Sequence, residues 1–160
     1  MEAFYDPHKD DPSLAEERRS LLRLYLYAGH HFYVLPEVER EYRRISKKDW
    51  REVHEEVVGT LLLEVDRPLD PKRVERRRDF FLSYHSKLSD CQILGEAEVA
   101  AMTLLLTRDD RPIRRLASLT SVRMLYPSAL WKESNITPGS KPMISPHPTN
   151  PLLMQTWWKL

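Results

Sequence analysis

The chain has 160 residues, 41% of them hydrophobic, so it is long and apolar enough to bury the core of one domain. Its 25 Lys and Arg residues nearly balance its 24 Asp and Glu residues, and the formal net charge of +1 excludes a protein that attracts nucleic acid through a strongly basic overall charge. A nucleic-acid partner would therefore have to meet a local basic patch.

Two further features bear on the compartment. The single cysteine, Cys91, excludes a disulfide within the chain and is typical of a reducing environment. The first residues lack the basic and apolar segments of a secretion signal, and no apolar run approaches the roughly 20 residues that a membrane-spanning helix needs. We expect a soluble, cytoplasmic protein that does not enter a membrane.

The predicted elements alternate between strands and helices along the chain. Short apolar runs that stop at turn signals predict strands at residues 2–5, 31–36, 103–107 and 121–127. Amphipathic spacing predicts helices at residues 13–29, 36–48, 49–59, 70–85, 89–102 and 109–119, and residues 127–133 are expected to form a turn or a helix. Residues 60–65 are ambiguous between a helix continuation and a strand. This alternation predicts the α/β class, with a parallel sheet covered by helices on both faces.

Local signals set the expected helix ends. Ser13, with Glu16 at the capping-box position, predicts the start of the first helix, and Gly29 predicts its end. Asp70, followed by a proline, predicts the start of a later helix, and Ser89 predicts the start of the next one.

The composition changes at Ser134. Residues 134–160 contain five of the twelve prolines, two lysines and no acidic residue, which excludes a regular helix. Apolar residues near the end of this segment favour a docked arm, placed on its own domain or on a second subunit, over a free tail. We therefore expect a domain at residues 1–133 and a Pro-rich C-terminal arm at residues 134–160.

Acidic residues gather where the predicted strands end. They are Asp6, Glu37, Glu39, Glu41, Asp90, Asp109 and Asp110. Because ligands bind at the carboxyl ends of strands in open parallel sheets, we expect these acids near one edge. Such carboxylates would repel one another, and Mg²⁺ or Mn²⁺ would relieve that repulsion because these ions take oxygen ligands together with substrate phosphates. The chemistry implied is phosphodiester hydrolysis.

Four stretches, AFYD, VLPEVEREY, LSDCQILGEAE and LLLTRDD, stand in the order and spacing of the motifs of PIN-domain nucleases, and VRMLYPSAL resembles the closing strand and proline turn of that family. The chain thus resembles this family, which includes the toxins of toxin–antitoxin pairs, over about residues 2–133. The resemblance implies that Asp6, Glu41, Asp90 and Asp109 are catalytic residues and hold Mg²⁺ or Mn²⁺. It implies that Thr107 supports a ligand or a water molecule, with Asp110 in a supporting position or at a helix cap.

A run of arginines begins beside Asp109. Arg108, Arg111, Arg114 and Arg115 are candidates for binding RNA phosphates, although most such charges lie on solvated helix faces.

The resemblance implies a metal-dependent endoribonuclease, of the toxin type or an RNA-processing type. The implied partners are RNA, a second copy of the chain in a homodimer, and an antitoxin-like protein.

In the family the first aspartate is usually followed by a small hydroxyl residue and a polar one, whereas this chain has Pro7 and His8. This difference motivates the alternative of a catalytically inactive PIN-like module that binds RNA or protein. A phosphoacceptor signalling domain is the least favoured hypothesis.

Overall fold

The computed structural model describes residues 12–48, 51–52, 55, 62–65, 68–144, 156 and 159–160. The chain divides into two compact units. The terminal unit comprises Met1–Phe32 and Tyr126–Leu160, and the central unit comprises Tyr33–Leu125. The predicted strand at residues 2–5 and most of the predicted helix at residues 49–59 lie outside the described residues.

Two helices of the terminal unit, α2 (Pro12–Ala28) and α8 (Pro127–Glu133), pack against each other. Leu22, Leu26 and Tyr27 of α2 are buried, and the Tyr27 ring meets the edge of Trp131 on α8 with the ring centroids 6.1 Å apart. The Glu17 carboxylate of α2 accepts a hydrogen bond from the backbone N–H of Ser128 at 2.9 Å, so it caps the first turn of α8.

The described parts of the C-terminal arm lie against α2. The backbone N–H of Ile144 donates to the carbonyl oxygen of Leu26 at 3.0 Å, and Arg23 donates to the carbonyl oxygen of Lys159 at 3.0 Å. Leu160 packs against the apolar cluster of α2. The arm is therefore docked on its own chain at residues 144 and 159–160. Docking on its own chain is one of the two arrangements expected from the sequence, the other being docking on a second subunit.

Gly29 ends α2, as predicted. Its φ of +63° lies in the left-handed region, where a side chain causes strain. A Cβ at this position would also lie 3.3 Å from the terminal methyl carbon of Met143. The helix itself begins at Pro12, so the prediction that Ser13 is the N-cap is wrong by at least one residue.

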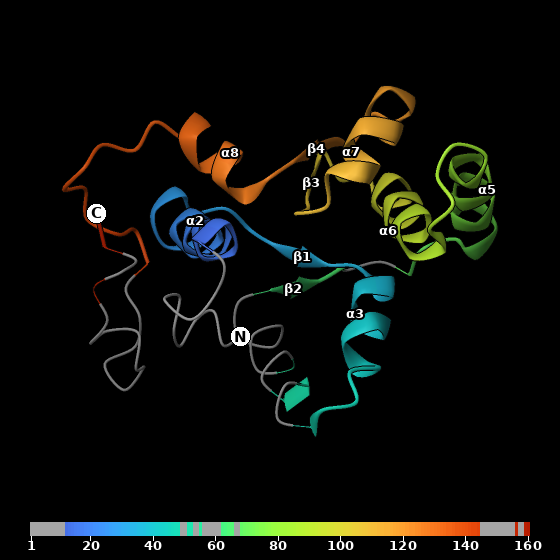
Figure 1. The fold of residues 1–160 in the computed structure, drawn as a ribbon, viewed down its shortest axis with the longest axis horizontal. Helices are drawn as coiled ribbons and strands as arrows, with labels where there is room; N and C mark the ends of the chain where they lie inside the picture. The colour runs from blue at the N-terminus through green and yellow to red at the C-terminus, as the bar shows by residue number, and fades with distance from the viewer. Residues whose placement is uncertain are drawn as a thin grey trace. The chain divides into compact units, whose positions relative to one another are not determined.

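The central unit is an α/β structure with parallel strand pairs (Figure 1). Its elements are β1 (Tyr33–Val34), α3 (Pro36–Arg43), β2 (Leu63–Glu64), α5 (Pro71–Leu82), α6 (Leu88–Val99), β3 (Leu104–Leu106), α7 (Asp110–Leu116), the 3₁₀ helix η1 (Ala117–Leu119) and β4 (Arg123–Leu125). Tyr33 pairs with Leu63 between β1 and β2, and Leu104 pairs with Arg123 between β3 and β4.

The α/β class and the parallel pairing agree with the prediction, whereas the single predicted sheet does not. Within the described residues, β1 and β2 form one sheet and β3 and β4 form another. The strands are two or three residues long, shorter than the apolar runs that predicted them. After Val34, Leu35 serves as the N-cap of α3 and Pro36 takes the first helical position, so helix formation ends the strand early.

The starts of two helices show how well local signals predict a helix end. Asp70 caps α5, as predicted, by accepting hydrogen bonds from the N–H groups of Lys72 and Arg73 at 3.0 and 3.3 Å. The prediction that Ser89 caps the next helix is wrong, because α6 begins at Leu88 and Lys87 occupies the N-cap position.

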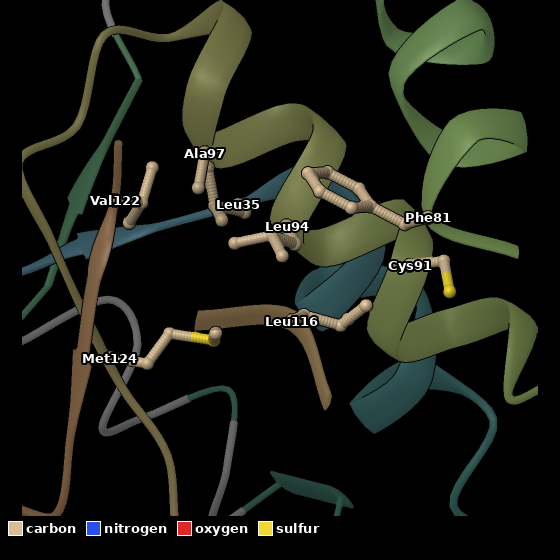
Figure 2. Close-up of a cluster of buried hydrophobic side chains, with 8 residues drawn as sticks. All are labelled: Leu35, Phe81, Cys91, Leu94, Ala97, Leu116, Val122 and Met124. Carbon is tan, nitrogen blue, oxygen red and sulfur yellow. The ribbon is translucent and has the colours of Figure 1, made fainter. Parts of the chain in front are cut away.

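The core of the central unit is built around α6 (Figure 2). Its buried residues come from the segment before α3 and from α5, α6, α7 and the β4 region: Leu35, Phe81, Cys91, Leu94, Ala97, Leu116, Val122 and Met124. Gly95 allows a close approach of α6 to α5, because a Cβ there would lie 3.2 Å from the carbonyl oxygen of Val74 and from the nitrogen of Arg78. This packing positions the N-terminal half of α6, which carries Asp90.

No helix in the described part of the chain is long and apolar enough to cross a membrane.

Candidate functional site

The ammonium group of Lys87 interacts with carboxylates from separate segments of the central unit. Its Nζ donates to Oδ1 of Asp90 at 2.7 Å. This hydrogen bond raises the pKa of Lys87, and the charges of Asp90, Glu41 and Asp109 raise it further while partial burial opposes them. The charges of three of the four predicted acids, from α3, from α6 and from the residue before α7, thus act on this ammonium group, and Asp90 contacts it directly.

Asp90 is the most enclosed of these acids, with 11% of its side chain exposed. Its second oxygen, Oδ2, lies 2.8 Å from Nε2 of His85, a residue that is 5% exposed. Nδ1 of His85 is buried and has no hydrogen-bond partner among the described residues. Because a carboxylate oxygen accepts hydrogen bonds, Nε2–H of His85 is the donor of this hydrogen bond and Oδ2 of Asp90 is its acceptor. Both oxygens of Asp90 are thus held, one by an imidazole and the other by an ammonium group.

Asp109 is held by Arg111. Its Oδ1 accepts from the backbone N–H of Arg111 at 2.9 Å and from Nε at 3.1 Å, while Oδ2 accepts from Nη2 at 2.8 Å. These side-chain and backbone hydrogen bonds lower the pKa of Asp109 to about 2. The N–H of Asp109 donates to Oγ1 of Thr107 at 3.2 Å, so Thr107 shapes the turn that presents Asp109 as the N-cap of α7.

Glu41 is positioned through the buried carboxylate of Glu96. Glu96 is 2% exposed, and its Oε2 accepts from the backbone N–H of Glu37 at the start of α3 at 2.8 Å. Its Oε1 accepts from Arg40 and from Gln92, each at 2.9 Å. These contacts attach α3 to α6. Glu41 itself is exposed on α3, one residue after Arg40.

The four candidate RNA-binding arginines fall into two classes. Arg111 pairs with Asp109, and Arg114 pairs with Asp110 at 2.9 Å along α7. Arg108 and Arg115 are exposed and form no ion pair within the part of the chain that the structure describes. Arg108 and Arg115 are therefore better placed than the other two to contact a phosphate.

An open groove of about 570 Å³ lies between α3, α5 and α6. Arg40 and Arg44, which flank Glu41 in the sequence, and Leu88 and Gln92, which flank Asp90, are among its lining residues. Arg44 is exposed and has no ion pair among the residues described here. Glu41 and Asp90 themselves are not among the residues that line this groove.

The predicted acids do not form a complete metal-binding site among the described residues. Asp6 lies outside the described residues. Within the described ranges, three or more His, Cys, Asp or Glu side chains nowhere gather in a group that could hold a metal ion. Carboxylate oxygens are the ligands that a hard divalent cation prefers, and the charges of Glu41, Asp90 and Asp109 all act on one ammonium group.

Lys87 and His85 were not singled out by the sequence patterns, although both contact Asp90. The spacing of Lys87 and Asp90 at i and i+3 was the one available signal, because such a pair is adjacent on the first turn of a helix. His85 precedes α6, and only the tertiary fold turns its ring toward Asp90.

Comparisons with models of protein families, with curated proteins and with solved structures found no significant match.

Proposed function

We propose that this chain is a metal-dependent endoribonuclease with a PIN-like arrangement, in which helices flank the parallel strands on both faces. In this proposal Glu41, Asp90 and Asp109, together with Asp6, hold Mg²⁺ or Mn²⁺. The observation that carries the proposal is the placement of Asp90, which accepts a hydrogen bond from the ammonium group of Lys87 at 2.7 Å while the charges of Glu41 and Asp109 act on the same group. A divalent cation bound there would activate a water molecule and neutralise charge on a phosphodiester.

The residues of the chain would prepare this site in distinct ways. His85 orients Asp90 through the 2.8 Å contact at Oδ2. Glu96 attaches the helix of Glu41 to α6, and Arg111 keeps Asp109 ionised because it holds the pKa of that carboxyl near 2. Arg108 and Arg115 would contact phosphates of the RNA backbone, which supplies affinity without choosing a sequence.

The biological setting is part of the same proposal. A toxin-type or RNA-processing role, a homodimer, an antitoxin-like partner and a cytoplasmic location all follow from the resemblance of the motifs. The pairing of Arg111 and Arg114 with aspartates reduces the expected basic patch to Arg108 and Arg115.

One observation favours a second candidate, a PIN-like module that binds RNA or protein without cleaving RNA. The ammonium group of Lys87 already neutralises the carboxylate of Asp90, and the guanidinium group of Arg111 neutralises that of Asp109. A site that its own side chains neutralise needs no metal ion to offset the repulsion between carboxylates.

Cleavage of labelled single-stranded RNA in Mn²⁺ or Mg²⁺ tests the first candidate. We expect wild type to cleave, EDTA to abolish cleavage, and Asp90→Asn to reduce the rate about 100-fold or more, the scale of losing one electrostatic group from an active site. Asp79→Asn is the matched control, because Asp79 is an exposed aspartate of α5 that pairs with Arg78.

The proposal would be overturned if folded wild type cut neither single-stranded nor hairpin RNA with either metal. Retained binding of those RNAs, measured by fluorescence anisotropy, would then favour the binding module. Equal activity of wild type and Asp90→Asn would show that cleavage comes from another site or from a contaminant.

A further inference from the structure

A hollow of about 500 Å³ beside the C-terminal end of α6 is lined mainly by arginines. Three guanidinium groups of α5 face it, and one carboxylate of α6 is the only acidic group among its described lining residues. These residues are Arg73, Arg76, Arg77, Glu98, Val99 and Ser121. The described lining therefore carries an excess of positive charge.

The carboxylate of this hollow is already engaged. Glu98 forms an ion pair with Nε of Arg77, and its Oε1 accepts from Nη2 of Arg77 at 3.0 Å and from Oγ1 of Thr120 at 2.6 Å. Arg73 and Arg76 are exposed and have no ion pair among the described residues. Their charges are therefore open to an anionic ligand, and Arg77 is held in place beside them.

Two exposed aromatic rings follow the arginines along α5. Phe80 is 38% exposed and Tyr84, directly after the helix, is 50% exposed, and their ring centroids lie 5.4 Å apart. The guanidinium carbon of Arg77 lies 4.7 Å from the centroid of the Phe80 ring, so the arginine of the hollow and the first ring are in contact. The basic hollow thus continues into a pair of aromatic rings, the combination that holds single-stranded nucleic acid in many proteins.

We propose that an arginine–aromatic surface, formed by Arg73, Arg76, Arg77, Phe80 and Tyr84, binds single-stranded RNA. The inference rests on the RNA substrate of the proposed function and names the surface that holds the strand. The guanidinium groups contact phosphates of the backbone, and the rings stack on unpaired bases. Every base has a face that can stack, so this surface holds a strand without reading its sequence.

A solvated helix face without a ligand is the structural alternative. Arginines on such a face commonly pair with acids of the same helix, as Arg78 does with Glu75 and Asp79. Arg73 and Arg76 depart from this pattern, because they face a hollow and have no ion pair among the described residues. An acidic peptide would use these arginines as well, but it would leave the two aromatic rings without a role.

The test is the fluorescence anisotropy of a labelled single-stranded RNA of about ten nucleotides, titrated with the full chain in EDTA so that metal-dependent cleavage is absent. We expect Arg73→Gln and Arg76→Gln each to weaken binding. Each should also reduce the slope of log K against log salt concentration by about 0.7, the contribution of one phosphate contact with a single strand. Phe80→Leu and Tyr84→Leu should each weaken binding about fivefold or more at an unchanged slope, because a lost base stack releases no counterions.

The matched control is Arg43→Gln, because Arg43 is an exposed arginine of α3 that is already paired with Glu39. This variant should leave both the Kd and the slope unchanged, and circular dichroism checks that every variant is folded. An equal loss in Arg43→Gln would overturn the proposal. So would wild-type Kd values in either the arginine variants or the aromatic variants, or failure of wild type to bind the strand at low salt.

Two competing ligands test the choice of RNA strand. A duplex of the same RNA hides its bases from the rings and should bind more weakly, so equal binding of duplex and single strand would overturn the proposal. Poly-glutamate bound as tightly as the RNA would also overturn it and would indicate an acidic protein partner.

Binding and cleavage are scored separately. RNA cleavage in Mn²⁺ by a chain whose Kd is the same in all these variants would overturn the arginine–aromatic surface and leave the proposed nuclease in place. Binding that depends on this surface, in a chain that cuts no RNA, would support the surface and overturn the nuclease.

Discussion

Asp109 shows how a single residue can serve both the fold and the proposed chemistry. It is the N-cap of α7, and its carboxylate also forms a two-pronged pair with the guanidinium of Arg111. Both contacts require the ionised form, so together they favour loss of the proton. The same side chain therefore begins a helix and presents negative charge toward Lys87.

These contacts predict how the carboxyl group of Asp109 titrates. We expect its carboxyl carbon, followed by NMR, to titrate near pH 2, and we expect Arg111→Ala to raise that pKa toward the ordinary value of 3.8. Because the folded pKa is the lower one, the stabilisation by Asp109 is complete above about pH 4 and is lost as the pH falls toward 2. Arg115→Ala, which removes an exposed arginine of the same helix, should leave the titration unchanged. An unchanged pKa in Arg111→Ala would show that Arg111 does not set it.

At the scale of elements, the helices follow local signals more closely than the strands do. Residues 127–133, expected to form a turn or a helix, form α8, and α5 begins where Asp70 and Pro71 predict. Hydrogen bonds within a helix join near neighbours, whereas a strand needs a partner from elsewhere in the chain. The β1 and β2 strands accordingly contain only those residues that find a parallel partner, two in each strand.

The cap of α5 gives a prediction at this scale. Asp70→Ala should lower the free energy of unfolding in urea by about 1 kcal/mol, because two N–H groups of the first turn lose their acceptor. Asp70→Asn retains a side-chain oxygen at the cap and should lose only a few tenths of that amount. Equal losses in the two variants would contradict a capping role and would indicate that the charge of Asp70 matters instead.

At the scale of the whole molecule, Cys91 reports on the core of the central unit. It is fully buried between α6 and its neighbours, and burial raises the pKa of its thiol to about 11 (Figure 2). A thiol with this pKa is almost entirely protonated at pH 8, so it is a poor nucleophile even apart from its burial. Since the chain contains no other cysteine, reaction with a thiol reagent measures opening of this core alone.

Leu94→Ala should accelerate labelling of Cys91 strongly. Leu94 is 1% exposed on α6, and loss of such a side chain costs about 3 kcal/mol, which raises the open population about 100-fold. Leu88→Ala is the control on the same helix, because Leu88 is 57% exposed and its loss should leave the labelling rate nearly unchanged. Equal rates in wild type and Leu94→Ala would show that labelling does not require opening of the core.

Part of the candidate site was predictable because its signals are local. Asp90 and Asp109 stand at helix starts, where short-range patterns are most informative, and the structure places each of them at such a start. The partners of the neighbouring cations were harder to predict. The sequence indicated Arg111 as a candidate for phosphate binding, whereas the structure pairs it with Asp109. A pattern of charges cannot distinguish a free arginine from a paired one, since pairing depends on distances between side chains.

The sequence by itself determined the α/β class, most helix starts and the glycine that ends α2, because capping, φ preference and apolar spacing act over a few residues. The tertiary structure decided that the strands form two parallel pairs within the described residues, that His85 and Lys87 contact the two oxygens of Asp90, and that the charges of Glu41 and Asp109 also act on Lys87. These features depend on packing between segments far apart in the chain, above all on Gly95 and the buried Glu96, which bring α5 and α3 against α6. Electrostatic interactions act through space, so the neighbours of a charge become known only when the fold has placed them.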